Sequence, residues 1–155
     1  MESKSSRREF CANAITFVTV ASLIEGCGGG SGNPGNPGGE NVPQLSRISG
    51  TTAGNTVTVN IDGSSPLAST GNAALVEAGG NSFLVSRTGQ DTFTALTAVC
   101  THEGCTVEGF RNSQYVCPCH GSTYSTSGSV VKGPASQSLR QFPSTFSGGV
   151  LSFNA

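Results

Sequence analysis

Two short segments of this chain are rich in residues that bind soft metal ions. Residues 100–105 read Cys-Thr-His-Glu-Gly-Cys, and residues 117–122 read Cys-Pro-Cys-His-Gly-Ser. Both histidines of the sequence and four of its six cysteines lie in these segments. A Cys-x-His pair followed by a Cys-x-x-His pair supplies two thiolates and two imidazoles. That set suits a tetrahedral zinc ion, and it equally suits a [2Fe–2S] cluster with cysteines at one iron and histidines at the other.

The cysteines Cys105 and Cys119 distinguish these two interpretations. A zinc site gives no reason for a further cysteine in each segment, whereas a cluster at the tip of two loops needs the loops clamped together. An exported protein can oxidise such a pair to a disulfide, and closing a loop of this length stabilises a fold by about 3 kcal/mol. The cysteine inventory therefore favours the cluster, and a zinc-stapled structural β-domain is the remote alternative.

The paired segments resemble the ligand loops of Rieske iron–sulfur proteins, in the disulfide-containing form that occurs in cytochrome bc and bf complexes and in arsenite oxidase. The resemblance extends from about Thr56 to the C-terminus. It implies one Rieske-type [2Fe–2S] cluster and an all-β fold, an antiparallel β-sandwich with a small cluster-binding subdomain of two ligand loops. The implied ligands are Cys100 and Cys117 at one iron and His102 and His120 at the other, with Cys105 bonded to Cys119.

Further residues match the high-potential members of this family. The resemblance implies that Ser122 gives its hydroxyl to a bridging sulfide and that Tyr124 gives its phenol to a ligand cysteine sulfur. Hydrogen bonds to cluster sulfur favour the extra negative charge of the reduced state, so they raise the reduction potential. Gly133, Pro134 and Ala135 resemble the third loop of the family, which covers the cluster.

Glu103 departs from the family pattern, because quinol-oxidising members usually carry leucine beside the first ligand histidine. In those proteins the tip of the histidine enters an apolar quinol pocket. A carboxylate at this position resists desolvation, and its charge disfavours the reduced cluster by Coulomb repulsion. Glu103 therefore leaves the expected cluster intact and counts against quinol as a substrate.

The rest of the sequence must supply the elements that position these loops. Glycine is frequent (22 residues) and Trp is absent, which favours short strands and turns over helices. Two expected strands, Thr92–Val99 and Gln114–Val116, lead directly into the two metal-binding segments. Residues 79–81 and 111–113 carry hairpin turn signals. The other expected strands are Thr56–Ile61, Ala74–Ala78, Ser82–Arg87, Val107–Phe110, Ser129–Val131, Leu139–Phe142 and Val150–Phe153.

Residues 1–27 predict a bacterial export signal. Arg7 and Arg8 precede an uncharged, mostly apolar run from Cys11 to Ile24. That run suits a signal peptide but is shorter than the roughly 20 apolar residues of a membrane-spanning helix. The sequence Ser-Arg-Arg-Glu-Phe resembles the twin-arginine signal, which serves proteins exported already folded. Cys27 follows in a sequence like a lipoprotein cleavage site and is a candidate for lipidation; simple cleavage and an uncleaved anchor are the alternatives.

The remaining chain divides into a linker and a folded domain. Residues 28–46 are rich in Gly, Asn and Pro, and such a segment cannot bury enough apolar surface to fold. It is expected to be a flexible linker with a reach of about 20 Å. Residues 47–155 are the expected Rieske domain. We therefore expect the protein in the bacterial cell envelope, on the periplasmic face, tethered to the membrane through its N-terminal segment.

These features predict a one-electron carrier in an exported redox chain, as a stand-alone protein or as the small subunit of a periplasmic oxidoreductase. The alternative is the Rieske subunit of a quinol–cytochrome c reductase. Expected partners are a cytochrome c or a cytochrome b-type membrane complex, with quinol in the alternative. Charged residues make up only 11% of the chain and the net charge is -1, so nothing indicates nucleic-acid binding. An oxygenase would need further histidines for a mononuclear iron, so no complete active site of its own is expected.

Overall fold

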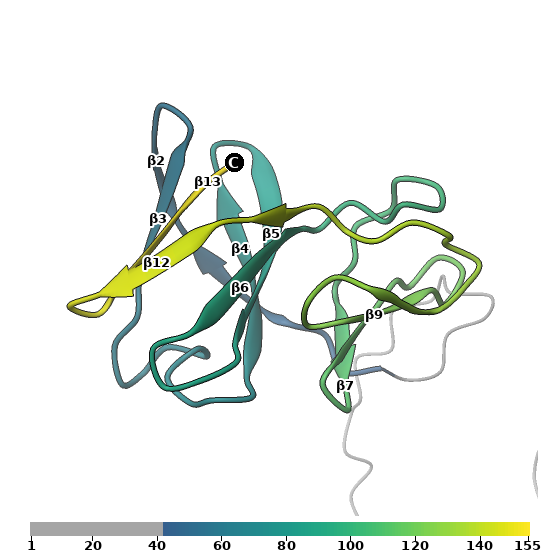
Figure 1. Cartoon of the computed structure of the whole chain (residues 1–155), viewed down its shortest axis with the longest axis horizontal. Helices are drawn as coiled ribbons and strands as arrows, with labels where there is room; N and C mark the ends of the chain where they lie inside the picture. The colour runs from purple at the N-terminus through teal and green to yellow at the C-terminus, as the bar shows by residue number, and fades with distance from the viewer. Residues whose placement is uncertain (1–41) are drawn as a thin grey trace, which may run out of the picture. The chain divides into compact units, whose positions relative to one another are not determined.

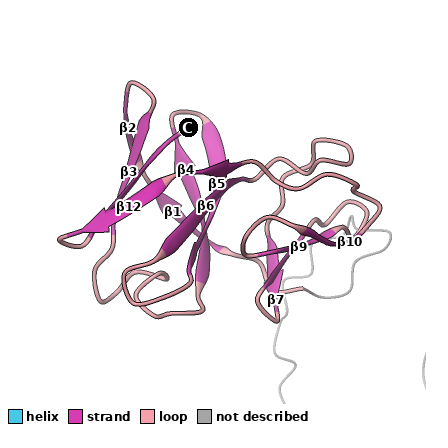
Figure 2. Cartoon of the chain, in the orientation of Figure 1, coloured by secondary structure: helices cyan, strands magenta, loops and turns pink. Residues whose placement is uncertain are grey.

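The computed structural model describes residues 42–155, and Figures 1 and 2 show them as strands joined by loops. The expected export signal, Cys27 and most of the expected linker lie outside the described residues. Within 42–155 there is no helix that could cross a membrane. The strands are β1 (Ser46–Ser49), β2 (Thr51–Ala53), β3 (Thr56–Asn60), β4 (Ala73–Ala78), β5 (Asn81–Arg87), β6 (Phe93–Thr97), β7 (Gly109–Arg111), β8 (Gln114–Val116), β9 (Thr123–Ser125), β10 (Val130–Lys132), β11 (Gln141–Phe142), β12 (Ser144–Ser147) and β13 (Val150–Asn154).

Two of the three sheets pack face to face and form a sandwich. One has five strands in the order β1-β4-β5-β6-β11, and the other has four in the order β12-β13-β3-β2. Every pairing in these sheets is antiparallel except β1 with β4, which is parallel. Phe83, Phe142 and Phe153 meet between the sheets, and Phe83 makes edge-to-face contacts with both of the other rings. The expected all-β sandwich is confirmed.

The central strands of the five-stranded sheet are buried on both faces. Side chains alternate along a strand, so Val76 and Val85 point into the sandwich core, whereas Leu75 and Leu84 point into a second core on the opposite face. This second core lies against the third sheet, β10-β9-β8-β7, which stands beside the sandwich in Figure 1. It contains Cys100, Cys117, Tyr115 and Tyr124. The loops that carry Cys100 and Cys117 therefore pack against a sheet whose central strands are buried on both faces.

A short segment ahead of the first strand joins the subdomain to the sandwich. Gln44 forms a β-bridge with Gly109, and Leu45 is buried. Arg47 then pairs with Glu77 on β4 and with Glu108 beside β7, at 2.5 and 2.7 Å. Residues 42–46, which the sequence assigned to the linker, therefore pack on the folded domain.

The nine strands expected from the sequence are all present, with ends that agree within two residues. Four further strands, β1, β2, β9 and β12, were not expected. Three of these are edge strands, and β2 is exposed along its whole length. An exposed edge does not impose the apolar alternation by which strands are recognised. The turn between β4 and β5 consists of Gly79 and Gly80 with φ of 57° and 78°, as a two-residue hairpin requires.

Candidate metal centre

The two metal-binding segments fold as near copies of one loop. In each, the fifth residue donates its backbone N–H to the carbonyl of the first, and the first donates its N–H to the carbonyl of the sixth. The four distances lie between 2.8 and 3.0 Å. The fifth residue is Gly104 in one loop and Gly121 in the other, with φ of 74° and 71°. Glycine adopts this left-handed conformation freely, which explains the Gly at the same place in both loops.

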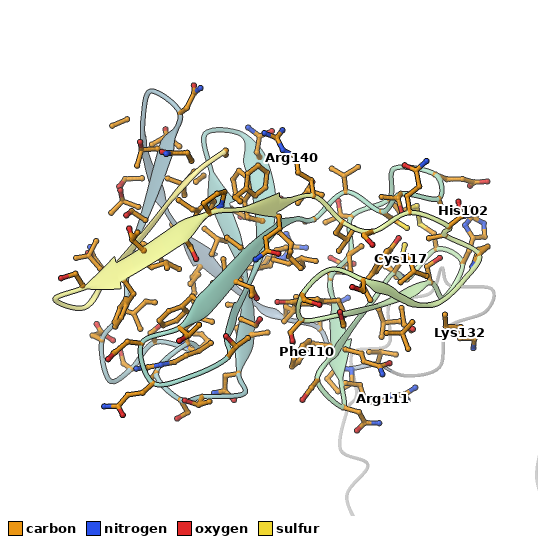
Figure 3. The ribbon with its side chains drawn as sticks, in the orientation of Figure 1. His102, Phe110, Arg111, Cys117, Lys132 and Arg140 are labelled. Atoms are coloured by element: carbon orange, nitrogen blue, oxygen red, sulfur yellow. A yellow bond between two sulfur atoms is a disulfide. The ribbon has the colours of Figure 1, made fainter. Side chains whose placement is uncertain are left out.

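The loops carry their histidines at different positions. His102 is the third residue of its loop, whereas His120 is the fourth of the other, where the first loop has Glu103. The two imidazole rings nevertheless meet at the tip, with centroids 4.9 Å apart and an angle of 85° between their planes. Both residues are exposed, and Figure 3 shows His102 at the outer end of the loops with Cys117 further inside.

The first residue of each loop is a free, buried cysteine. Cys100 and Cys117 are 2% and 1% exposed. Burial raises the pKa of the Cys117 thiol to about 11. Burial acts in the same direction on Cys100, but hydrogen bonds from the Tyr124 phenol and the His102 backbone outweigh it and leave the pKa of that thiol below its ordinary value. Donors thus converge on the Cys100 sulfur and favour its thiolate, the form that binds a metal.

A disulfide joins the two loops between Cys105 and Cys119, with Cα atoms 6.5 Å apart. It links the sixth residue of the first loop to the third of the second. Because these two sulfurs are bonded to each other, the thiols left for a metal within residues 42–155 are those of Cys100 and Cys117. Two buried thiols and two exposed imidazoles remain, and this donor set fits a [2Fe–2S] cluster held by cysteines inside and histidines outside.

Tyr124 on β9 places its phenol against the first loop. Its Oη lies 3.3 Å from Cys100 Sγ and accepts a hydrogen bond from the Thr101 backbone N–H at 3.2 Å. The side chain is fully buried. Desolvation raises the pKa of Tyr124, and its hydrogen bond to Cys100 raises it further, so the phenol stays protonated and able to donate. The phenol therefore lies where it can donate to the Cys100 sulfur.

Ala135, in the expected covering loop, and Gln137, just after it, each contact one of the two loops. Ala135 is buried and donates its backbone N–H to Ser122 Oγ at 3.0 Å. Because the Ser122 oxygen accepts this bond, its own hydrogen is available for another acceptor. On the first loop, Thr101 Oγ1 donates to the carbonyl of Gln137 at 2.6 Å. Neither residue could be recognised in the sequence, because Thr101 stands between two candidate ligands and Gln137 contributes only its main-chain carbonyl.

Glu103 lies at the exposed tip beside the imidazoles. Its side chain is 60% exposed, and Oε2 is 3.6 Å from His120 Nδ1. Ligand atoms of His102, Glu103 and His120 all lie within 4.8 Å of one another. The carboxylate therefore adds negative charge to the face through which a partner would approach the imidazoles.

Sequence comparison shows which known proteins share these loops. Residues 58–143 match the family described as the Rieske [2Fe-2S] domain. The cytochrome b6-f complex iron-sulfur subunit of Prochlorococcus marinus (strain AS9601) is 38% identical over 86 residues, which cover 48% of this chain and 48% of that protein. The same subunit of Chlorobaculum thiosulfatiphilum is 43% identical over 56 residues, 36% of this chain and 31% of that protein. The chain thus spans half or less of the length of these relatives.

Two solved structures are similar to part of this chain. The cyanobacterial plasma membrane Rieske protein from Synechocystis PCC 6803 is 30% identical with a TM-score of 0.48, covering 54% of this chain and 86% of that chain. A chain from the complex of reduced oxygenase and oxidised ferredoxin in carbazole 1,9a-dioxygenase is 20% identical with a TM-score of 0.50, covering 63% and 92%. The second likeness is one of fold.

Proposed function

Because this chain belongs to the Rieske [2Fe–2S] family, we propose that its folded domain carries single electrons through one Rieske cluster. We assign Cys100 and Cys117 to one iron and His102 and His120 to the other. The observation that carries this proposal is the division of the donor set. The two free thiols are buried in the core, and the two imidazoles meet at the exposed tip.

The bound cluster supplies reversible one-electron oxidation and reduction. The buried thiols would hold one iron in the core, whereas the exposed imidazoles would hold the other where a partner can approach. The Tyr124 phenol donates toward Cys100 Sγ, 3.3 Å away, and Ser122, whose oxygen is already an acceptor, has its hydrogen free for a cluster sulfide. With the cluster bound, both hydrogen bonds would favour the reduced state and would raise the reduction potential.

The cellular placement that the sequence supports best is the periplasmic face of a bacterial membrane. Residues 1–27 would direct twin-arginine export, Cys27 would carry a lipid, and the segment up to residue 41 would tether the domain. On this interpretation the protein is a stand-alone carrier or the small subunit of a periplasmic oxidoreductase, and a cytochrome c is a suitable partner. The exposed carboxylate of Glu103 beside the imidazoles supports a polar partner surface over an apolar quinol pocket.

A second placement has support from the relatives, which are iron-sulfur subunits of cytochrome b6-f complexes. In that case the domain would take an electron from quinol beside a cytochrome b-type subunit. Purification from its native membrane distinguishes the two placements. Isolation without a cytochrome b, together with oxidation of the reduced protein by cytochrome c, supports the carrier. A stable complex with cytochrome b and quinol-dependent reduction support the alternative.

Electron transfer itself is tested by an equilibrium redox titration of the purified full-length protein. We expect one reversible transition with the slope of a one-electron couple, about 59 mV per tenfold change in the oxidised-to-reduced ratio. A protein that shows no redox transition would contradict the proposed function in both placements.

A further inference from the structure

Thr101 lies between the buried phenol of Tyr124 and the covering loop. Its Oγ1 is 3.0 Å from Tyr124 Oη and 2.6 Å from the carbonyl oxygen of Gln137. Tyr124 Oη is in turn 3.3 Å from Cys100 Sγ and 3.2 Å from the Thr101 backbone N. The phenol is fully buried, so it has these three polar neighbours and no competing water on its surface.

Counting hydrogens fixes the direction of most of these bonds. A carbonyl only accepts, so the Thr101 hydroxyl donates its one hydrogen to Gln137. A backbone N–H only donates, so the Thr101 amide donates to Tyr124 Oη. Tyr124 then has one hydrogen to give and two acceptors within reach, Thr101 Oγ1 and Cys100 Sγ. The hydroxyl oxygen and the thiolate sulfur therefore compete for the same phenolic hydrogen.

We propose that Thr101 is a positioning residue that draws the Tyr124 hydrogen partly away from Cys100 and so lowers the reduction potential of the cluster. The inference rests on the proposed function, because it takes Cys100 as a cluster ligand. A hydrogen bond to ligand sulfur stabilises the reduced state. An acceptor that competes for that hydrogen has the opposite effect, so Thr101 limits the effect of Tyr124.

The carbonyl of Gln137 is the part of the covering loop that makes Thr101 an acceptor. If this carbonyl moved away, the Thr101 hydroxyl could turn and donate to Tyr124 Oη, and the phenolic hydrogen would be left to Cys100. The position of the covering loop is therefore coupled to the strength of the bond to the ligand sulfur. The coupling runs through main chain at residue 137, so it does not depend on the glutamine side chain.

The experiment measures the midpoint potential of full-length variants with the iron and acid-labile sulfide content of each. Thr101→Val removes the hydroxyl and keeps nearly the same shape, and we expect its potential to rise above that of the wild type. Thr101→Ser keeps the hydroxyl and should retain the wild-type value. In a Tyr124→Phe background, Thr101→Val should cause no shift, because the residue acts only through the phenol. This last comparison also removes any effect of the added methyl group on local polarity.

Thr106→Val serves as the matched control. Thr106 follows the first loop, is exposed, and makes no side-chain hydrogen bond among residues 42–155, so its substitution should leave the potential unchanged. Thr101→Ala also removes the hydroxyl, and its smaller side chain cannot cause a steric clash. It should also raise the potential.

The outcomes separate the inference from the proposed function. A full complement of iron and sulfide with an unchanged or lower potential in Thr101→Val contradicts the inference alone. A shift that persists in the Tyr124→Phe background contradicts it as well. If Thr101→Val and Thr101→Ala both lose iron and sulfide, Thr101 has a purely structural role and the inference fails. Absence of the cluster from the wild-type protein overturns the proposed function itself.

Discussion

Glu103 and His120 occupy the same position in two loops of the same backbone conformation, and the Glu103 carboxylate lies 3.6 Å from His120 Nδ1. The correspondence follows from the shared hydrogen-bond pattern, in which Gly104 and Gly121 close the loops at the next residue. The fourth position therefore carries the imidazole of His120 in one loop and the carboxylate of Glu103 in the other. Any partner that approaches the exposed imidazoles meets this carboxylate.

Removing the charge of Glu103 should raise the reduction potential. Two unit charges about 4 Å apart in water interact by about 1 kcal/mol. We therefore expect Glu103→Gln to raise the reduction potential by at most about 40 mV. Because the side chain is exposed, the shift should shrink as salt is added. Redox titrations at low and high ionic strength measure both effects. A lower potential for Glu103→Gln would contradict the expectation that the Glu103 charge disfavours the reduced cluster.

Removing either hydroxyl donor should lower the potential while the cluster stays bound. Tyr124→Phe removes the donor to Cys100 Sγ, and Ser122→Ala removes the hydroxyl held by Ala135. Tyr115→Phe is the matched control, because Tyr115 is equally buried but belongs to β8 and makes no hydrogen bond to Cys100 among the described residues. Variants with full iron content and wild-type potential at both positions would refute the tuning role.

The disulfide should stabilise the folded domain and retain the cluster. Replacing Cys105 and Cys119 together by alanine opens a closure of 14 residues, so the free energy of unfolding should fall by about 3 kcal/mol. The cluster should also be lost faster in the presence of a chelator, since the ligand loops are no longer joined. Cys27→Ser, outside the described residues 42–155, is the control. Equal unfolding curves for the double variant and this control would show that the disulfide contributes nothing.

Tyr115 should make the protein less stable in alkaline solution. Its side chain is fully buried, its hydroxyl has no hydrogen-bond partner within residues 42–155, and burial raises its pKa well above the ordinary value. The neighbouring Ser86 acts on this pKa in the opposite direction without offsetting burial, and its own hydroxyl pairs with Thr94 at 2.7 Å. The folded state therefore favours the protonated phenol.

For such a group the stability is fully present below the unfolded pKa of about 10 and is lost as the pH rises above it. We expect Tyr115→Phe to lose less free energy of unfolding than the wild type between about pH 9.5 and 11.5. Near neutral pH the two should differ by only about 1 kcal/mol, because the hydroxyl gains no bond on folding. Urea unfolding across this pH range provides the measurement, and parallel losses in both proteins would count against a buried, protonated Tyr115.

The metal-binding loops and most strands could be predicted from the sequence because chemistry and burial restrict the residues there. Cluster ligands must be Cys or His at a narrow spacing, and strands with a buried face must alternate, as in residues 56–61. The strands β1, β2 and β12 were not predicted because they lie at sheet edges, where Ser and Thr are tolerated on both faces. The packing of residues 42–46 on the domain was hidden for a related reason, since Gln44 pairs mainly through its backbone.

The hydrogen-bond network around Tyr124 could be predicted only in part. The phenol of Tyr124 belongs to a recognisable motif. Thr101, proposed to compete for the phenolic hydrogen, stands between two expected ligands and gives no sequence signal of its own. Gln137 contributes a main-chain carbonyl, for which no side chain gives a signal. The position of that carbonyl depends on how the covering loop folds back over the first ligand loop, which is a tertiary property.

The most direct test of the central claim is the iron, acid-labile sulfide and zinc content of the purified full-length protein. The account predicts equal amounts of iron and sulfide, two of each per chain as in a [2Fe–2S] cluster. It also predicts that this content is lost when Cys100 or Cys117 is replaced by serine. One zinc ion per chain without sulfide would show that the two cysteines and two histidines hold a structural metal instead, and it would contradict the account.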